Sequence, residues 1–198
     1  MLVLASQAQA QVNFYTQGYF TSAFGTCNNS IPVAGSPMNN TCVGGGFQLA
    51  YTAVPTNPGP IASGSVVSLG QFTLTGTGTA AVPDNFVTFT LLVRQTAPTP
   101  GTGTFMGYIT GSVTTDGPNG DLSTIVWKPN QMVNISPATY QMIFDNVGPA
   151  SGTGLAIPIN QTRGITALVT TVPEPSTYVL MAAGLAGLFA VSRRRRNV

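Results

Sequence analysis

The chain has 198 residues, with seven basic side chains, five acidic side chains and no histidine. Four basic residues and one acidic residue fall in the last 27 positions, which leaves a body with three basic and four acidic groups and a net charge of −1. Such a body has no cationic stripe to bind phosphates, so nucleic acid is excluded as a partner. The lack of histidine excludes Ser-His-Asp and Cys-His catalysis and histidine-based metal sites.

The first ten residues resemble the end of a signal peptide. Residues 1–5 (MLVLA) end an apolar run, and Ala8 and Ala10 form an A-x-A cleavage signal followed by Gln11. The positive n-region is missing and the apolar h-region is cut short, which indicates a fragment or a start codon further upstream. A loose N-terminus with a chance A-x-A is the alternative. We expect an exported protein whose mature body covers residues 11–171.

Short β-type runs alternate with Gly, Pro and Asn clusters throughout the body. The expected strands are residues 12–24, 46–54, 65–75, 85–95, 104–115, 122–128, 139–145, 155–159 and 165–172. The alternation slips at Gly70-Gln71, where a β-bulge or two shorter strands with a kink would explain it. No amphipathic helix of useful length occurs in the body. Eight or nine short strands with regular turns predict an all-β fold, an antiparallel β-sandwich with jelly-roll-like connections.

The two cysteines, Cys27 and Cys42, enclose a loop rich in Asn, Pro, Gly and Ser. In an oxidising compartment we expect them to form a disulfide, and two free thiols are the alternative. A metal site at this pair is not expected, because the chain has no histidine and no second cysteine pair. We expect no cofactor.

The body has four carboxylates, all of them aspartates: Asp84, Asp116, Asp121 and Asp145. A hydrolase of the glycosidase type would need two of them brought together from distant positions. Asp116, Asn119 and Asp121 could supply oxygen ligands to Ca²⁺. A plain hairpin turn needs the same residue types, so this segment is equally explained without a metal.

The tail, residues 172–198, has three parts. Residues 172–177 (VPEPST) contain two prolines, which keep the segment extended and accessible. The uncharged run from Tyr178 to Val191 would span about 21 Å as a helix, short of the roughly 30 Å hydrocarbon core of a bilayer. With Tyr178 as an interfacial anchor and a basic stop at the other end, it is expected to form a single short transmembrane helix with a cytoplasmic C-terminus. The basic stop consists of Arg193, Arg194, Arg195 and Arg196.

This tripartite tail resembles the PEP-CTERM sorting signal of Gram-negative bacteria, which has a Pro-Glu-Pro motif, a short membrane segment and an Arg-rich end. The resemblance implies that Pro173, Glu174 and Pro175 are recognised by exosortase, a membrane protease thought to remove the hydrophobic tail and pass the protein to the cell surface. The tail would hold the precursor transiently in the inner membrane. One alternative is an ordinary anchor that is never cut, and another is a buried core helix followed by a solvated basic end.

The resemblance also implies a surface or extracellular-matrix protein, because PEP-CTERM proteins often accompany exopolysaccharide production. We expect the body to be a non-enzymatic structural component of a biofilm. The first alternative is a carbohydrate-binding module, which needs exposed aromatic side chains on one face; the candidates are Tyr15, Tyr19, Tyr51, Tyr108 and Trp127. The second alternative is an Asp-dependent hydrolase. Self-assembly into fibres is also open, because Thr-rich strands with few charges lack the usual protection of sheet edges.

Overall fold

The computed structural model describes residues 12–22, 26–27, 33–44, 46–55, 61–76, 80–113, 122–127, 132–143, 154–172, 181–189 and 192, with the backbone alone at 22, 80–86, 110–113 and 122–127. The described residues form twelve strands and a short helix at residues 181–189. The strands are β1 (Asn13–Ser22), β2 (Thr26–Cys27), β3 (Asn40–Gly44), β4 (Phe47–Thr52), β5 (Ser65–Gly76), β6 (Ala80–Ala97), β7 (Gly101–Val113), β8 (Leu122–Trp127), β9 (Met132–Ile135), β10 (Ala138–Ile143), β11 (Gly154–Pro158) and β12 (Gln161–Thr171).

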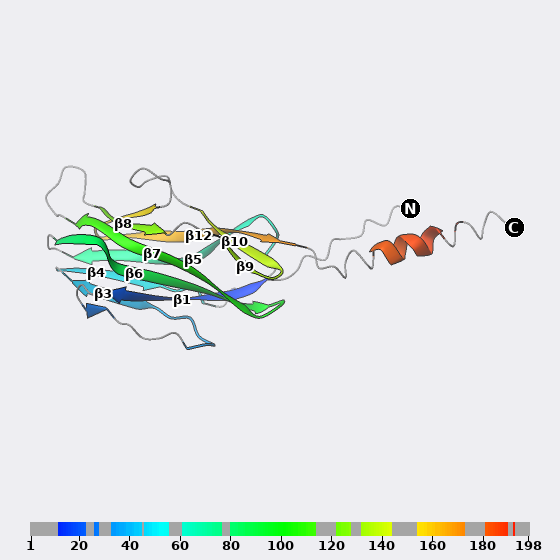
Figure 1. Cartoon of the computed structure of the whole chain (residues 1–198), viewed down its shortest axis with the longest axis horizontal. Helices are drawn as coiled ribbons and strands as arrows, with labels where there is room; N and C mark the ends of the chain where they lie inside the picture. The colour runs from blue at the N-terminus through cyan, green and yellow to red at the C-terminus, as the bar shows by residue number, and fades with distance from the viewer. Residues whose placement is uncertain are drawn as a thin grey trace.

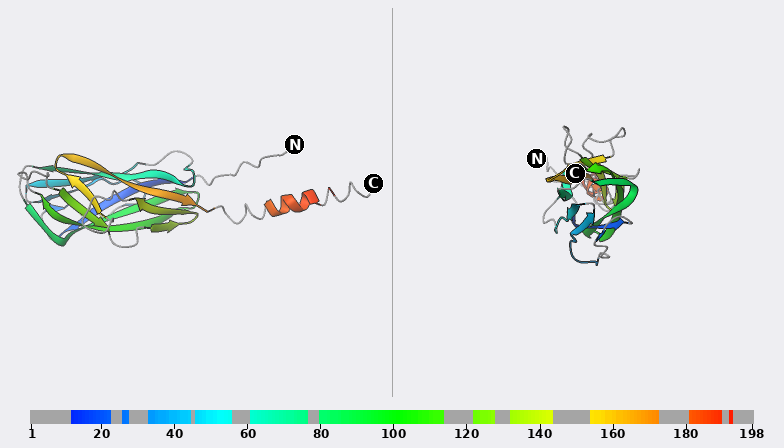
Figure 2. Two further views of the ribbon diagram at one scale, coloured as in Figure 1. Left: turned by 90° about the horizontal axis from the view of Figure 1, so that it is seen from above. Right: turned by 90° about the vertical axis from the view of Figure 1, so that its left-hand side faces the viewer.

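Two antiparallel sheets lie face to face in an elongated sandwich (Figures 1 and 2). Sheet A has five strands in the order β1-β6-β7-β8-β11. Sheet B has seven strands in the order β2-β3-β4-β5-β12-β10-β9. The expected all-β class with antiparallel sheets is therefore confirmed.

The connections combine hairpins within a sheet with crossings between the sheets. Strands β2 to β5 are neighbours in sequence and in sheet B, and β6 to β8 follow one another in the same way in sheet A. The chain changes sheet between β1 and β2, β5 and β6, β8 and β9, β10 and β11, and β11 and β12. The jelly-roll-like connectivity stays a prediction.

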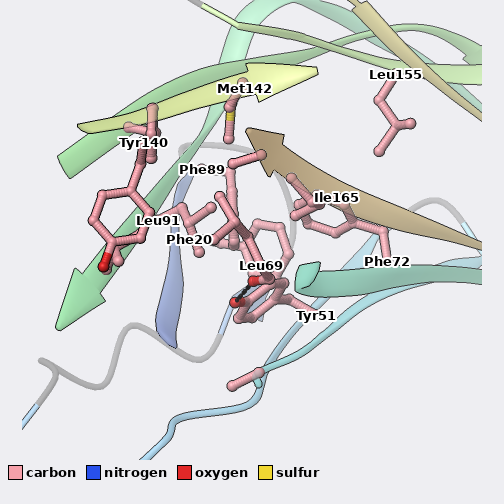
Figure 3. Packing of buried hydrophobic residues seen from close by; sticks show 14 of the residues in the cluster. Phe20, Tyr51, Leu69, Phe72, Phe89, Leu91, Tyr140, Met142, Leu155 and Ile165 are labelled. Atoms are coloured by element: carbon pink, nitrogen blue, oxygen red, sulfur yellow. Dashed lines mark hydrogen bonds between the residues drawn. The ribbon is translucent and has the colours of Figure 1, made fainter. Parts of the chain in front are cut away.

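The core between the sheets is centred on four aromatic side chains, one from each of four strands. Phe89 of sheet A lies with its ring centroid 4.7 Å from that of Phe72 and 4.9 Å from that of Phe20. Its centroid is 5.0 Å from that of Tyr51 in sheet B. Figure 3 shows these rings together in the middle of the sandwich. Each is almost fully buried, and burial of a side chain of this size stabilises the fold by about 1.5–3 kcal/mol.

A buried polar contact joins the two sheets beside this cluster. The Tyr51 hydroxyl lies 2.8 Å from the Thr16 hydroxyl of β1 and 2.8 Å from the carbonyl oxygen of Leu69 in β5. The backbone N–H of Val54 also donates to Thr16 Oγ1, at 2.8 Å. Burial raises the pKa of Tyr51, and its hydrogen bond with Thr16 acts in the opposite direction. The phenol therefore stays protonated and can keep both contacts.

The first half of strand β1, up to Gly18, is buried on both of its faces. Phe14 and Phe20 point into the sandwich, while Tyr15 and Gln17 on the opposite side are covered by residues 33–38. Nε2 of Gln17 donates to the carbonyl oxygens of Val33 and Ser36, both at 2.6 Å. Its Oε1 accepts from Nε of Arg94 at 3.0 Å, so every polar group of the Gln17 amide is satisfied.

The expected slip in residues 65–75 is confirmed as a bulge within one strand. In the pairing of β12 with β5, Ile165 lies opposite Gly70 and Thr166 lies opposite Ser68, so Leu69 is the extra residue. Gly70 has a φ of 123°, a conformation that a residue with a side chain rarely adopts. The bulge keeps Leu69, Phe72 and Leu74 all facing the core.

Several strand boundaries differ from the expected ones. The described residues form twelve strands rather than eight or nine, because β2 and β3 lie in the cysteine segment expected to be a loop and β9 was not anticipated. Strand β6 begins at Ala80 instead of residue 85, since its ladder with β7 resumes beyond an irregularity between Val82 and Val87. Pro83 lies within that irregularity, where a missing N–H donor is tolerated.

The described edge strands are short or already bonded. β2, β9 and β11 have 2, 4 and 5 residues, and β11 ends in Pro158. The edge of β1 is bonded to two other segments: Gly18 N–H donates to Met38 O at 3.3 Å, and Thr16 N–H donates to Val54 O at 3.1 Å. These are the usual devices against edge-to-edge pairing, so the expectation of unprotected edges is wrong for these strands.

Candidate functional site: the C-terminal exit

The tail leaves the sandwich from β12, a central strand. β12 pairs with β5 on one side and β10 on the other, and its Ile165, Ala167 and Val169 side chains are buried. The alternation of apolar and polar residues from Ile165 onward explains this placement, because a half-buried strand has a period of two. The last strand of the body is thus locked into the middle of sheet B.

Hydrogen bonds from two neighbouring turns hold the end of β12. The Val172 N–H donates to the carbonyl oxygen of Pro137 at 2.9 Å. On the other side, Ser63 Oγ accepts from the Thr171 N–H at 3.0 Å and donates to the Thr171 carbonyl oxygen at 3.4 Å. The Gly64 N–H donates to Val169 O at 2.8 Å. Backbone hydrogen bonds therefore hold the described chain as far as Val172, the residue immediately before Pro173.

A buried glutamine ties together the turns at this end of the sandwich. Nε2 of Gln95 donates to the carbonyl oxygens of Thr99 and Ser136, at 2.8 and 3.2 Å. Its Oε1 accepts from the Tyr140 hydroxyl at 3.0 Å. Burial raises the pKa of Tyr140, which keeps this hydroxyl as a donor. Gln95 thus connects the β6–β7 turn to the β9–β10 turn that carries Pro137.

Both ends of the described body lie at this same pole (Figures 1 and 2). Asn13 at the start of β1 is opposite Ala97, and the Thr96 hydroxyl donates to Asn13 O at 3.2 Å. The predicted signal-peptide residues Ala8 and Ala10 lie outside the described residues. The body is therefore joined to both flanking segments at one pole.

Beyond Val172, the described tail residues 181–189 form a helix that lies apart from the sandwich (Figure 1). In residues 181–189, the side chains of Met181, Leu185, Leu188 and Phe189 are all more than half exposed. No described helix is long and apolar enough to cross a membrane. The ends of the predicted membrane segment, Tyr178 and Val191, lie outside the described residues, so the transmembrane helix stays a prediction. The predicted sorting and basic-stop residues also lie outside them: Pro173, Glu174, Pro175, Arg193, Arg194, Arg195 and Arg196.

The disulfide expectation is confirmed. Cys27 and Cys42 are bonded and lie opposite each other in the β2–β3 ladder. They stabilise the short edge of sheet B, where the pairing alone covers only two residues of β2.

The predicted calcium ligands and most of the carboxylates fall outside the described residues. Asp116, Asn119, Asp121 and Asp145 are among these, and only the backbone of Asp84 is described, in β6. Within the described part of the chain, no three His, Cys, Asp or Glu side chains gather as a metal site would require. Calcium binding and Asp-dependent hydrolysis therefore stay untested expectations.

The outer side of sheet B carries no charged side chain among its described residues, and we call it the uncharged face. Residues on neighbouring strands lie side by side on this face. One such row runs from β5 through β12 and β10 to β9 and consists of Val66, Leu168, Gln141 and Met132. Thr73 and Thr162 also share a hydrogen bond of 2.8 Å there. The uncharged face comprises Gln48, Ala50, Thr52, Val66, Ser68, Gln71, Thr73, Thr75, Met132, Asn134, Thr139, Gln141, Ile143, Thr162, Thr166, Leu168 and Thr170.

The aromatic candidates for sugar binding are divided by the fold. Tyr15 and Tyr51 are buried, whereas Tyr19 and Tyr108 are half-buried on the outer side of sheet A. The Trp127 side chain is not described, and its Cα lies opposite Gly107.

Tyr19 and Tyr108 belong to a patch that we call the tyrosine face, made of Tyr19, Thr90, Met106 and Tyr108. Tyr19, Thr90 and Met106 lie side by side across three strands, and Tyr108 is two residues from Met106 on β7. Thr90 is only 4% exposed although it points outward, so its neighbours cover it. Met106 is 41% exposed.

Sequence reasoning missed the two buried glutamines that organise the exit and β1. Gln95 and Gln17 look like ordinary polar residues in strands, and no local pattern distinguishes them from exposed ones such as Gln141. A weak signal exists for Gln95, which continues the buried alternation of Leu91 and Val93. Only the approach of distant turns, however, makes its burial favourable.

The PEP-CTERM protein-sorting motif matches residues 171–196. No curated protein and no solved structure matches the chain. The matched stretch begins at the last residue of β12 and continues through the Pro-Glu-Pro segment, the apolar run and the arginines. This motif indicates an exported, surface-directed protein processed by an exosortase. The chain is therefore a protein with a C-terminal PEP-CTERM sorting motif.

Proposed function

We propose that the body of this exported protein is a non-enzymatic component of an exopolysaccharide matrix or biofilm, released there when an exosortase-type protease cuts the tail. The observation that carries the export and cutting is the motif match at residues 171–196. The precursor is held in the inner membrane by the apolar run until it is cut. The described contacts of the sandwich end at Val172, so removal of the tail leaves all of them in place.

The matrix role is supported by the uncharged face. Hydroxyl and amide groups alternate there with apolar groups such as Val66, which is 59% exposed, and Met132, which is 52% exposed. A neutral polysaccharide offers hydroxyl groups and apolar C–H faces and carries no charge. Contact with such a polymer leaves no charged group to be desolvated on either side.

A carbohydrate-binding module is the second candidate, and the tyrosine face favours it. Aromatic rings bind the apolar faces of sugars when they are accessible on one surface. Tyr19 and Tyr108 meet that condition in part, and Met106 adds an exposed apolar side chain beside Tyr108 on β7. In this version a few aromatic contacts on sheet A, rather than the broad face of sheet B, would hold the polymer.

The cutting is tested first by comparing the wild type with Glu174→Ala in the native host. Intact mass and fractionation should show a wild-type protein that has lost everything after the Pro-Glu-Pro region and has reached the surface or medium. The variant should keep its full C-terminus in the inner membrane. A full-length, membrane-held protein in both strains would mean a plain anchor, and the matrix role would lose its main support.

The two polymer-binding surfaces are separated by paired variants. Thr52→Lys with Gln141→Lys adds charge to the uncharged face, Tyr19→Ala with Tyr108→Ala removes the rings of the tyrosine face, and Thr104→Lys is a charge control on sheet A. Co-sedimentation with neutral exopolysaccharide from the same host should be weakened by the first pair alone. Loss of co-sedimentation only in the Tyr19→Ala, Tyr108→Ala variant would favour the carbohydrate-binding module. Equal co-sedimentation of all variants would contradict polymer binding by either surface.

A further inference from the structure

The sorting motif begins inside the folded body. Its matched residues start at Thr171, which belongs to β12 and pairs with Ala138. The next residue, Val172, is bonded through its N–H to Pro137 O at 2.9 Å. The fold therefore fixes the position and direction in which the chain enters Pro173.

This fixed start limits how far the recognised residues can lie from the sandwich. A fully extended chain advances about 3.3 Å per residue, so Pro175 can lie no more than roughly 10 Å from Val172. A protease that encloses residues 173–175 must therefore work directly against the end of the sandwich. Pro173 follows Val172 directly, so no spacer separates the sandwich from the Pro-Glu-Pro residues.

The end of the sandwich around this point forms one connected surface, which we call the exit pole. It is built from the turns at residues 61–64, 97–101 and 135–138 together with Val172, and its exposed members are Ser63, Gly64, Pro98, Thr99, Pro100, Ser136 and Val172. Gln95 bonds the turn at Thr99 to the turn at Ser136, and Ser63 bonds Thr171. These residues carry no charged side chain, and Val172 itself is 62% exposed.

We propose that the exit pole is a contact surface for the membrane-embedded sorting protease, which would read the Pro-Glu-Pro residues together with the folded surface beside them. This inference rests on the proposed cutting of the tail. A motif presented from a fixed exit loses less conformational entropy on binding than a free tail, which favours recognition at this distance. An uncharged pole also suits an enzyme whose substrate site lies close to the bilayer, because no charge has to be desolvated there.

The first test changes the distance between pole and motif. A flexible Gly-Ser spacer of about six residues is inserted between Val172 and Pro173 in the full chain in its native host. The control places the same spacer in the β11–β12 turn next to Asn160, an exposed residue at the opposite end of β12. The processed fraction, measured by intact mass, should fall roughly fivefold or more for the exit spacer and should not change for the control.

A second test leaves the length unchanged and alters the pole. Thr99→Glu adds a charge to the exposed pole, and Thr52→Glu makes the same change on the uncharged face. Processing should fall for Thr99→Glu alone, with the Cys27–Cys42 disulfide and solubility of both variants unchanged.

The outcomes distinguish this inference from the proposed function. Normal or faster processing with the exit spacer, or equal processing of the two glutamate variants, would overturn the exit pole as a contact surface while leaving the cutting intact. An unprocessed wild type, or normal processing of Glu174→Ala, would instead overturn the proposed cutting and with it this inference.

Discussion

The hydroxyl of Tyr140 donates a 3.0 Å hydrogen bond to Oε1 of Gln95, although the two residues come from opposite sheets. The same Gln95 side chain satisfies two turn carbonyls through its Nε2. A buried amide with three partners, Thr99, Ser136 and Tyr140, thus ties the turn that bonds Val172 to sheet A.

Replacing this amide should destabilise the body strongly. Gln95→Ala leaves one buried hydroxyl and two carbonyls without their partner, and we expect a loss of about 3 kcal/mol in the free energy of unfolding. For a domain of this size that corresponds to a fall in Tm of roughly 6–12 °C. Gln141→Ala, at an exposed position on β10, is the control and should change stability by less than about 0.5 kcal/mol. Equal melting of the two variants would contradict the role of Gln95.

Gly18 should not tolerate a side chain. A Cβ at this position would lie 2.4 Å from Cδ1 of Tyr51 and 2.5 Å from Cζ of Phe89, both in the centre of the core. Gly18→Ala should therefore cost about 1–3 kcal/mol through overpacking, seen as a lower denaturation midpoint. Gly164→Ala is the matched control, because nothing lies within 4 Å of its Cβ position. A variant at Gly18 as stable as the one at Gly164 would contradict this packing.

The two buried tyrosines should make the protein unstable in alkali. Burial raises the pKa of Tyr51 and Tyr140 in the folded state, whereas an unfolded phenol ionises near pH 10. Above that pH the unfolded state binds fewer protons, so stability present at neutral pH is lost as the pH rises.

This pH dependence can be measured by absorbance titration near 295 nm alongside unfolding curves. The two phenols should ionise only together with unfolding. In a Tyr51→Phe, Tyr140→Phe variant, stability should depend less steeply on pH between roughly pH 10 and 11. An unchanged slope in that variant would contradict the assignment.

The disulfide should contribute substantially to stability. It closes a segment with a sequence separation of 15, for which the chain-entropy model gives about 3 kcal/mol. A thiol reductant should lower the Tm of the wild type, while a Cys27→Ser, Cys42→Ser variant should melt at the lower temperature with or without reductant. A wild type that melts at the same temperature in reductant would argue against this contribution.

Much of the architecture could be predicted from local sequence. Alternating residues such as Val87, Phe89, Leu91 and Val93 predicted a strand with one buried face, and all four are buried. The phase slip near Gly70 predicted the bulge, since a period of two cannot otherwise change face within a strand. The strands around the disulfide could not be predicted in the same way. Asn- and Gly-rich segments favour loops locally, and it is pairing with β4 that makes β3 a strand.

At the candidate site, too, some features could be predicted from local sequence and others could not. The Pro-Glu-Pro motif, the apolar run and the arginines are defined by residue type and order alone. The sequence by itself therefore determined that the protein is exported and sorted by its tail. The β class of the body also follows from local alternation. Only the tertiary structure decided that Gln17 and Gln95 are buried, that sheet B has an uncharged outer face, and that the tail leaves from a central strand with Val172 bonded to Pro137. The physical reason is that these features depend on contacts between residues far apart in the chain, and local sequence patterns carry little information about such contacts.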